Sequence, residues 1–516
     1  MSATPPPPPS SSFPDHHIAI VGAGFTGSLL AAHLLRTAPA PLVVHLIEAG
    51  HPTGAGLAYS TGNSGHLLNV RAYNMSAYPG DPRHFLRWLW GRDDGGAIPP
   101  SGHAFVSRGL YGAYVRDVLA EAQREAPPHA RLNLIRGEVV DLRADTRTPP
   151  GLPTPFNAPW QVRLSDGRTI TADTAALCIG HFLPALPPLS NPGAADALAS
   201  PRFIGDPWDG AAIAGIPADA PVAILGTGLT MVDTVLSLLD QGHRGTITAV
   251  SRRGLLPQCH QETRPYTSFL HPEVMPHTVL DVLIALKADA RRAAEAGYDW
   301  RSAFDALRPH HHRIWASLPM EERRRFLRHA RPFWEVHRHR MAPDVAGRIE
   351  TARASGQLTI LAGRLTAAVL SGDGPNGEGP NGERLDLTIA ARGGTGEHRL
   401  HAAALVNATG TNCDYARIRH PLVRSLLERG LARPDALRLG LDVTETGAVI
   451  NAEGEVIPHL LALGPVSKAP FWEMTAVPEL RGQCAQAAAR ILADWPHGAG
   501  ALPPADTLGS APHQRM

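Results

Sequence analysis

The feature that most constrains this chain is a glycine-rich turn between an apolar strand and an apolar helix near its start. Residues 16–21 read as a buried strand, and Gly22, Gly24 and Gly27 follow with the spacing G-x-G-x-x-G. The first glycine permits a tight turn, the second lets backbone N–H groups approach a pyrophosphate, and the third lets helix and strand pack closely. The sequence therefore predicts a dinucleotide-binding strand–helix–strand unit.

An acidic residue at the end of the next strand indicates which dinucleotide this unit binds. Residues 42–48 form a second apolar strand that ends in Glu48, 21 residues after Gly27. A carboxylate there accepts hydrogen bonds from the hydroxyls of an adenosine ribose and repels a 2′-phosphate. The first site is therefore predicted to hold FAD or NAD. The alternative is a glycine-rich turn without a ligand, but the flanking strands, helix and acid favour the dinucleotide.

The opening pattern recurs in the middle of the chain with a different ending. Gly226 and Gly228 follow an apolar strand, and Met231 replaces the third glycine. The next strand ends in Arg252 and Arg253 rather than in an acid. Because guanidinium groups pair bidentately with phosphates, this ending predicts a 2′-phosphate and hence NADPH. The alternative is an arginine pair that is merely solvated.

Two such motifs in 516 residues predict an α/β chain with two Rossmann-like dinucleotide-binding domains, one for FAD and one for NADP, and a helical insertion. The predicted parts are a disordered tail at 1–15, the first part of the FAD-binding domain at 16–183, the NADP-binding domain at 184–365 with a helical insertion at about 256–346, the second part of the FAD-binding domain at 366–495, and a tail at 496–516. The first tail is rich in serine and proline and lacks the basic and apolar regions of a signal peptide.

Composition excludes several classes of partner. The formal charge of +1 provides no basic field for nucleic acid, and the chain has no apolar run long enough to cross a membrane. Four scattered cysteines without a C-x-x-C pair argue against a disulfide framework and a redox-disulfide reductase, and favour a reducing cytoplasm. Two histidine-rich segments lack acids with ligand spacing, so no metal is predicted.

Later segments are predicted to return to the first site. Residues 175–181 and 403–410 read as buried strands that end in glycine, and residues 460–465 read as another. A helix that starts near Thr475 would aim the positive end of its dipole at the pyrimidine end of the flavin, where it stabilises the charge of the reduced ring.

The candidate contacts follow from these positions. The predicted FAD contacts are Gly22, Gly24, Phe25, Thr26, Gly27, Glu48, Gly56, Leu57, Ala58, Asn69, Gly180, Thr409, Gly410, Gly464 and Thr475, and the predicted NADPH contacts are Gly226, Gly228, Leu229, Thr230, Arg252 and Arg253. Asn69 and Met75 are predicted to face the flavin ring, although they also fit an ordinary surface loop. Trp472 fits stacking near the ring and fits core packing equally well.

A set of longer motifs carries a resemblance to a known family. The motifs are the turn at 22–27 with Glu48, the loop at 54–59, and the segments 326–343, 407–410 and 472–481. Over residues 18–492 the chain resembles a bacterial family of FAD/NAD(P)-binding proteins. The wider relatives of that family are flavin-dependent monooxygenases, including the amine N-hydroxylases of ornithine and lysine and the flavoenzymes that oxidise the nitrogen of aspartate.

The chain departs from the branch that oxidises sulfur and carbon. That branch carries F-x-G-x-x-x-H, whereas residues 203–209 of this chain, Phe-Ile-Gly-Asp-Pro-Trp-Asp, lack the histidine. The resemblance therefore does not extend to Baeyer–Villiger or thioether chemistry.

The two sites and the resemblance imply an FAD-dependent, NADPH-using monooxygenase. It would act through a flavin C4a-hydroperoxide formed with O₂ on a small nucleophilic substrate, an amine or amino acid. Asn69, Met75, Lys468 and Trp472 are candidates for shielding or orienting the reactants. The insertion is expected to shape the substrate pocket, with Arg338 and Arg340 as partners of a carboxylate or phosphate, or as members of structural ion pairs. Two alternatives stay open: a flavin reductase or dehydrogenase with a non-oxygen acceptor, and a non-catalytic nucleotide-binding sensor.

Overall fold

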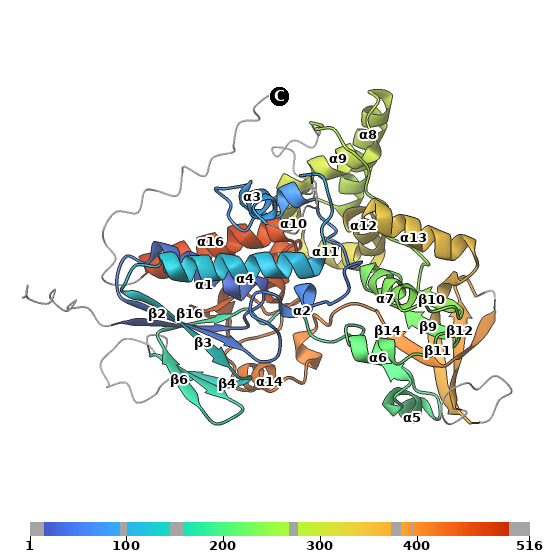
Figure 1. The fold of residues 1–516 in the computed structure, drawn as a ribbon, viewed down its shortest axis with the longest axis horizontal. Helices are drawn as coiled ribbons and strands as arrows, with labels where there is room; N and C mark the ends of the chain where they lie inside the picture. The colour runs from blue at the N-terminus through green and yellow to red at the C-terminus, as the bar shows by residue number, and fades with distance from the viewer. Residues whose placement is uncertain are drawn as a thin grey trace, which may run out of the picture.

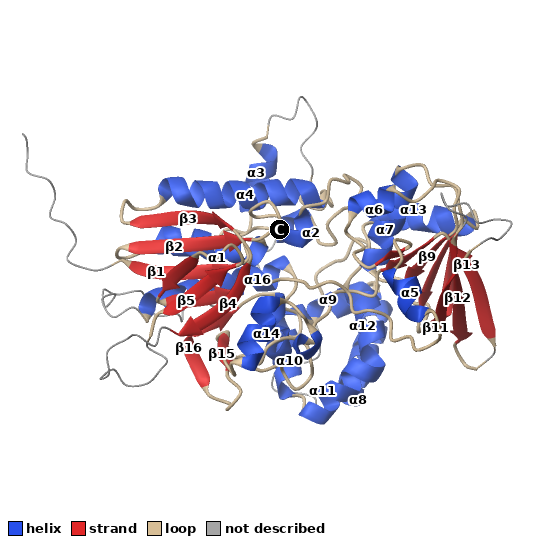
Figure 2. Ribbon diagram, turned by 90° about the horizontal axis from the view of Figure 1, so that it is seen from below, coloured by secondary structure: helices blue, strands red, loops and turns tan. Residues whose placement is uncertain are grey.

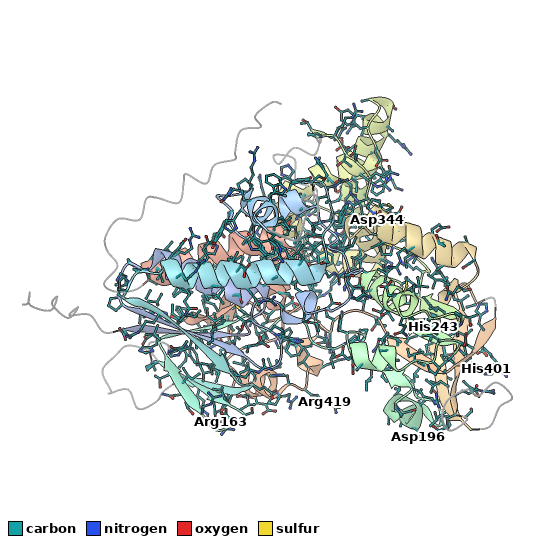
Figure 3. The ribbon with its side chains drawn as sticks, viewed as in Figure 1. Arg163, Asp196, His243, Asp344, His401 and Arg419 are labelled. Carbon is teal, nitrogen blue, oxygen red and sulfur yellow. The ribbon has the colours of Figure 1, made fainter. Side chains whose placement is uncertain are left out.

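The computed structural model describes residues 15–92, 101–144, 158–267, 277–372, 383–394 and 396–494. Two lobes lie side by side, each built on a sheet of mainly parallel strands, and a helical segment packs across both (Figures 1 and 2). Arg163 and His401, labelled in Figure 3, lie in different lobes on opposite sides of the molecule. This architecture confirms the predicted α/β fold with two Rossmann-like domains and a helical insertion.

The first lobe uses chain from both ends of the sequence. Its strands are β1 (His16–Val21), β2 (Leu42–Glu48), β3 (Ala130–Arg136), β7 (Thr174–Leu177), β15 (Ala448–Ile450) and β16 (Val456–Ala462), in the order β15-β16-β7-β1-β2-β3. All neighbours are parallel except the β15–β16 pair. Since β16 pairs with β7, residues near the end of the chain complete the sheet that the first strand begins.

The central strands of this sheet are almost continuously apolar because both of their faces are covered. On one face α1 (Phe25–Thr37), α4 (Arg108–Glu125) and α16 (Val477–Ala493) pack together, and on the other lie β4 (Val139–Ala144), β5 (Trp160–Leu164), β6 (Thr169–Ala172) and α14 (Pro421–Glu428). Figure 1 shows these two layers above and below the sheet. The short elements α2 (Gly56–Tyr59), η1 (Ala72–Asn74) and α3 (His84–Trp90) lie between β2 and α4.

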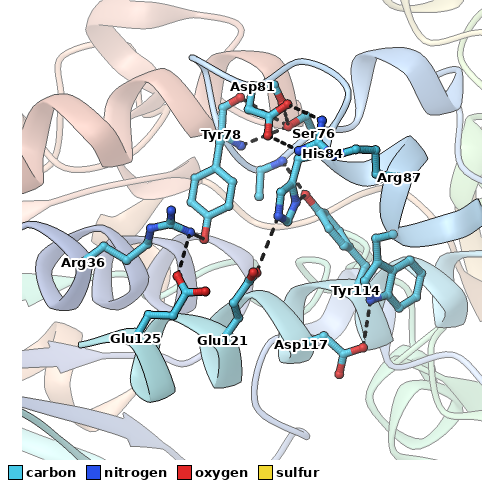
Figure 4. Close-up of polar contacts among 12 residues, drawn as sticks. Arg36, Ser76, Tyr78, Asp81, His84, Arg87, Tyr114, Asp117, Glu121 and Glu125 are labelled. Atoms are coloured by element: carbon cyan, nitrogen blue, oxygen red, sulfur yellow. Dashed lines mark hydrogen bonds and ion pairs between the residues drawn. The ribbon is translucent and has the colours of Figure 1, made fainter. Parts of the chain in front are cut away.

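Polar side chains fix α3 and the preceding loop to the long helices, as Figure 4 shows. The Tyr114 hydroxyl lies 2.8 Å from His84 Nδ1, and Trp88 Nε1 donates to Asp117 at 2.8 Å. Arg36 donates to the Tyr78 hydroxyl at 3.1 Å. Burial lowers the pKa of His84, so the ring is held as a neutral partner.

The second lobe repeats the first with additional strands. Its sheet contains β8 (Phe203–Ile204), β9 (Val222–Leu225), β10 (Ile247–Ser251), β11 (Leu358–Ser371), β12 (Arg384–Ala391), β13 (Glu397–Ala402) and β14 (Ala404–Asn407), in the order β13-β12-β11-β10-β9-β14-β8. Helices α6 (Gly210–Ala214), α7 (Leu229–Asp240) and α13 (Pro343–Ala354) cover one face, and α5 (Ala194–Ala199) packs on the other.

The end of this lobe differs from the predicted boundary at residue 366. That position falls inside β11, whose first half pairs with β10 and whose second half pairs with β12. The strands that follow, up to Asn407, also pair within the second sheet. The second lobe therefore extends to Asn407, because a single long strand joins the parallel and antiparallel parts of its sheet.

The insertion lies between β10 and α13. It consists of α8 (Val279–Glu295), α9 (Trp300–Ala306), η3 (Arg308–His310), α10 (His311–Ser317), α11 (Met320–Arg325), the π-helical turn η4 (Phe326–Ala330) and α12 (Arg331–Arg338). Its two ends are held together: Met341 N donates to the Gln258 carbonyl at 2.8 Å, and His260 N donates to the Met341 carbonyl at 2.9 Å. The crossover from β10 to β11 is therefore preserved beneath the inserted helices.

Hydrogen bonds and an ion pair join the lobes. The guanidinium of Arg108 donates to both carboxylate oxygens of Asp233 at 2.6 and 3.2 Å. The two segments that connect the lobes run antiparallel to each other, and Asn412 N donates to the Phe182 carbonyl at 3.2 Å. Within the described ranges, no helix has both the length and the apolar character needed to cross a membrane.

Candidate functional site

The turn after β1 can be built only from glycine at two of its positions. Gly22 has φ +99°, and a Cβ there would lie 2.5 Å from the Cys178 carbonyl oxygen. A Cβ on Gly27 would lie 1.9 Å from the Gly22 carbonyl oxygen, so α1 packs directly on its own turn. Gly24 is the N-cap of α1 and has no side chain to occupy the first N–H groups of the helix. These N–H groups and the helix dipole together form an anion-binding position.

A cleft of about 230 Å³ runs from this turn along the carboxyl ends of the strands. Ten of the predicted contacts line it: Gly22, Gly24, Phe25, Thr26, Glu48, Gly56, Leu57, Ala58, Gly180 and Thr475. A long cleft along this edge of a parallel sheet has the shape and place that a dinucleotide requires. The residues present therefore fit an FAD.

The sequence missed several residues of this cleft. Gly137, Glu138, His181, His420 and Pro465 also line it. Gly137 comes from the end of β3, and its N–H donates to the Glu48 carbonyl at 3.0 Å. The sequence could have indicated Gly137, because the carboxyl ends of neighbouring parallel strands meet at one edge of a sheet. His420 is the N-cap of α14, a helix whose place in space no local pattern reveals.

Backbone N–H groups hold the Glu48 side chain at the end of the cleft. One carboxylate oxygen accepts from Ala23 N at 2.9 Å, and the other accepts from Gly50 N at 3.0 Å and His51 N at 2.9 Å. The first oxygen keeps lone-pair capacity for a further donor, whereas the second already accepts two hydrogen bonds. The carboxylate is therefore fixed in place and able to accept a ribose hydroxyl of an adenosine.

Of the two residues predicted to face the flavin ring, the structure places Met75 elsewhere. Met75 is 1% exposed in the core of the first lobe, and its carbonyl accepts from the Tyr111 hydroxyl at 3.0 Å. The Asn69 carbonyl lies 3.0 Å from His260 Nε2, which ties its loop to the insertion. The prediction that Met75 faces the flavin is wrong, because its loop turns the side chain into the apolar core.

Gly464 has a structural reason for being glycine. Its φ is +84°, and a Cβ there would lie 2.7 Å from Thr26 Oγ1. Its N–H donates to Gln483 Oε1 at 2.8 Å. The chain after β16 is thereby held against the start of α1, which brings Pro465 to the cleft.

The second glycine turn has the same backbone arrangement as the first. Gly226 has φ +105°, and a Cβ there would lie 2.2 Å from the Ala408 carbonyl oxygen. Gly228 is the N-cap of α7, and Leu229 and Thr230 form the first turn of that helix. These four predicted contacts therefore surround a second anion-binding helix terminus.

Strand register identifies the residue of the second lobe that corresponds to Glu48. Ile47 pairs with Val21, and Val250 pairs with Leu225, so Ser251 takes the place of Glu48. The Ser251 hydroxyl accepts from Thr227 Oγ1 at 2.9 Å and from Gly254 N at 3.0 Å. The acid of the first site is thus replaced by a neutral side chain.

The two arginines follow Ser251 directly. Arg252 is exposed, and the Arg253 guanidinium lies 4.9 Å from the centre of the Phe333 ring in α12. The contact with Phe333 joins the insertion to this end of the second site. The two sites therefore end in groups of opposite charge.

Thr409 and Gly410 lie beside the second turn. They follow β14, and Thr409 Oγ1 donates to Asn407 Oδ1 at 2.7 Å. By strand register they correspond to Ile179 and Gly180 of the first lobe. Since β14 belongs to the second sheet, Thr409 and Gly410 lie at the carboxyl end of that sheet, where the chain leaves it for the first lobe.

The loop after β16 contains η6 (Pro465–Ser467) and α15 (Lys468–Phe471) and packs against the insertion. Trp472 is 4% exposed and stacks on Trp315, with ring centres 4.9 Å apart. The side chain thus lies among the aromatic residues of the insertion. Lys468 Nζ lies 4.8 Å from the centre of the Trp472 ring.

Arg338 and Arg340 form ion pairs within the protein. Arg338 Nε lies 3.2 Å from Glu473 Oε2, and Arg340 donates to both oxygens of Asp305 at 2.8 and 3.0 Å. Burial opposes ionisation of Glu473, but the charge of Arg338 prevails and lowers the pKa of Glu473 to about 2. Of the two interpretations of these arginines, the geometry favours structural ion pairing.

Comparison with known proteins agrees with this geometry. Residues 19–182 match a protein family described as FAD-NAD(P)-binding, which confirms that the first lobe is a dinucleotide-binding unit. No curated protein sequence matches the chain.

Solved structures share the fold over nearly the whole chain. An ornithine N-hydroxylase from Kutzneria sp. 744, in a complex with reduced FAD, NADP⁺ and L-ornithine, matches with a TM-score of 0.57 at 14% identity, covering 93% of this chain and 99% of that one. A cadaverine monooxygenase from Erwinia amylovora bound to FAD matches with a TM-score of 0.56 at 13% identity, covering 92% of this chain and 94% of that one. A bacillithiol disulfide reductase from Staphylococcus aureus matches with a TM-score of 0.51 at 10% identity, covering 93% of this chain and 99% of that one. The chain therefore has the two-lobe fold of FAD- and NADP-dependent flavoproteins.

Proposed function

We propose that this chain is an FAD-dependent, NADPH-using monooxygenase that transfers one oxygen atom of O₂ to the nitrogen of a small amine. One observation carries the proposal. The two glycine turns have the same backbone conformation, but the strand that follows each turn ends in groups of opposite charge. The first ends in a fixed carboxylate, Glu48, and the second in Arg252 and Arg253. Two different nucleotides fit such a pair of sites, one without and one with a 2′-phosphate.

The residues of the first cleft would hold FAD along its length. Glu48 would accept a ribose hydroxyl, the turn at Gly24 would face the pyrophosphate, and Thr475 would lie at the flavin end. A bound flavin would accept a hydride from a nicotinamide and would react with O₂. The net reaction balances as amine, O₂, NADPH and a proton giving hydroxylamine, water and NADP⁺.

The residues of the chain would bind and orient the reactants and would exclude water from them. The insertion and the loop carrying Trp472 pack together, and the two ends of that loop, Pro465 and Thr475, line the cleft. They are therefore the elements that would shield the reacting atoms from water. The similarity in fold to N-hydroxylating enzymes supports an amine as substrate. The free, scattered cysteines support a reducing compartment such as the cytoplasm.

The proposal is tested by aerobic turnover with isotopically labelled O₂. Purified holoenzyme, NADPH and a panel of small amines and amino acids should give a hydroxylamine that carries one labelled oxygen atom, detected by mass spectrometry. NADH should support the reaction much less well than NADPH. NADPH oxidation that yields only hydrogen peroxide with every amine, or rapid transfer of electrons to a non-oxygen acceptor, would instead support the reductase alternative.

A further inference from the structure

The basic residues of this chain are almost all arginines. Of the 48 Lys and Arg residues, two are lysines: Lys287, on the exposed surface of α8, and Lys468, on the loop after β16. An arginine keeps its charge in nearly any environment, whereas a lysine presents a compact ammonium group. Lys468 lies between Pro465 and Thr475, both of which line the cleft of the first lobe.

No carboxylate of the described residues lies within ion-pair distance of Lys468 Nζ, although Glu335 and Glu473 are near enough for their charges to act on it. Its Nζ contacts the Trp472 ring at 4.8 Å, and the Arg331 guanidinium lies 5.9 Å from the same ring. Arg331 is paired with Glu335 at 2.7 Å. Across the described residues, Lys468 has neither a hydrogen bond from its side chain nor an ion pair. Burial lowers the pKa of Lys468 most and the charge of Arg331 lowers it further, whereas the charges of Glu335 and Glu473 oppose this in part.

The position of this ammonium group is set by a strained turn. Trp472 has φ +60°, a left-handed conformation that costs a non-glycine residue on the order of 1–3 kcal/mol. Its N–H donates to the Lys468 carbonyl at 2.7 Å, which closes the turn and holds the indole beside the ammonium group. Trp315 and Phe326 of the insertion pack on the same indole at 4.9 and 5.0 Å. Several elements thus fix the Trp472 indole beside which the Lys468 ammonium group lies.

This place adjoins the cleft, because Lys468 lies on the short loop whose two ends, Pro465 and Thr475, line it. In agreement with this position, burial and then the charge of Lys468 lower the pKa of His181, which follows β7 and also lines the cleft. An unpaired cation in a poorly solvated position is unfavourable, and a carboxylate beside it forms a charge-assisted hydrogen bond that offsets the cost.

We propose that Lys468 binds an anionic group of the substrate, a carboxylate, so that the enzyme acts on amino acids in preference to diamines. The inference rests on the proposed function and assigns its substrate class. Lys468 is a binding residue in this account: it fixes one end of the substrate while the amine at the other end reaches the cleft.

Matched pairs of amines test the preference. L-Ornithine and putrescine, and L-lysine and cadaverine, differ only by a carboxylate. We expect a higher kcat/KM for the acid of any pair that reacts, and a loss of about 10- to 100-fold for that acid in Lys468→Met, as for a hydrogen bond between charged groups. The diamine should be unaffected, and Lys468→Arg should restore much of the loss. Lys287→Met is the matched control and should behave as the unaltered enzyme.

A second experiment reports on the site without turnover. Since the chain has two lysines, isotope-labelled lysine gives two side-chain NMR signals, which the Lys287→Met variant assigns. In the FAD-loaded protein, glutarate should shift the Lys468 signal and leave the Lys287 signal in place, whereas glutaramide, the uncharged analogue, should shift neither.

The outcomes separate the inference from the function on which it rests. An unmoved Lys468 signal, or equal kcat/KM values for both members of a reacting pair, would overturn the inference. A Lys468→Met variant that loses FAD or is reduced more slowly by NADPH, with both amines affected alike, would also overturn it and assign Lys468 to the flavin. Glutarate binding at Lys468 without oxygen transfer to any amine would keep the anion site and refute the monooxygenase.

Discussion

The glycine turns of the two lobes have the same backbone but differ at two side-chain positions. Gly22 and Gly226 have φ +99° and +105°, and a Cβ on either would meet a carbonyl oxygen of the neighbouring strand at 2.5 or 2.2 Å. Three positions after each second glycine, however, the first lobe has Gly27 and the second has Met231, which is fully buried. Because a side chain fits there, α7 must lie farther from its turn than α1 does.

The second difference is the residue that ends the following strand. Glu48 in the first lobe corresponds to Ser251 in the second, and two arginines follow Ser251. The comparison separates two requirements of the motif, one steric and one electrostatic. Sterics at the turn determine where glycine is needed, whereas charge at the strand end determines which nucleotide fits. Substitutions at each kind of position test these two statements.

The largest effect is expected from adding a methyl group to the third glycine of the first turn. In Gly27→Ala the Cβ would lie 1.9 Å from the Gly22 carbonyl oxygen, so α1 must move away from β1. We expect the free energy of unfolding to fall by about 3 kcal/mol and FAD to be lost. Thermal unfolding and the flavin absorbance of the purified protein measure both effects.

The matched control for this variant is Gly482→Ala in α16, where a Cβ has open space. It should change the free energy of unfolding by no more than about 1 kcal/mol, in the stabilising direction. Equal stability of the two variants would contradict the account of the close helix packing at Gly27.

The next effect concerns the charge difference between the sites. Arg252→Ala combined with Arg253→Ala removes the cations at the second strand end. We expect KM for NADPH to rise by about 10- to 100-fold, because two charge-assisted contacts to a 2′-phosphate are lost, while KM for NADH changes little. Steady-state reduction of the bound flavin with each nucleotide provides the ratio. A ratio that does not change would place the 2′-phosphate elsewhere.

A smaller effect is expected where the lobes meet. Arg108→Met removes the ion pair with Asp233, whose side chain is 12% exposed, and leaves that carboxylate without its partner. Since the pair is partly solvated, we expect a loss of about 1–2 kcal/mol in the free energy of unfolding. Denaturant unfolding of the apoprotein measures it. The double variant Arg108→Met with Asp233→Asn should recover part of the loss, and no recovery would show that the two residues act separately.

The smallest effect depends on pH and concerns the insertion. Glu473 has a pKa of about 2 in the fold against its ordinary 4.5, so its charge stabilises the folded state above pH 4.5, and this contribution is lost as the pH falls from about 4.5 towards 2. Glu473→Gln should therefore cost more stability at pH 7 than at pH 3.5, as measured by denaturant unfolding at both values. An equal cost at the two pH values would show that the carboxylate charge does not anchor the loop to Arg338.

Local patterns in the sequence sufficed for the turns, the strands that flank them and the charged strand ends. A glycine with positive φ and an acid at a fixed distance are consequences of chain geometry within about 30 residues. Residues that depend on contacts far along the chain were less accessible. Met75 fits a core and a cofactor site equally well by type, and only the fold shows that it is in the core.

The same limit explains the placement of Thr409 and Gly410. A buried strand that ends in glycine has the same sequence in either lobe, and sheet register decides which turn it adjoins. The contact of Arg253 with Phe333 joins segments from a strand end and an inserted helix, so no spacing rule foretells it. The sequence therefore sufficed to predict charge and steric requirements within a short segment, but not the pairing of distant strands or the docking of the insertion.

The most direct test of a two-nucleotide monooxygenase is to reduce the FAD-loaded protein with NADPH, mix it with O₂ and follow the flavin spectrum in a stopped-flow spectrometer. The account predicts rapid reduction by NADPH, and then a transient spectrum, distinct from those of reduced and oxidised flavin, that persists and decays faster when a substrate amine is present. Immediate return of the oxidised spectrum without a transient, at every amine tested, would contradict it.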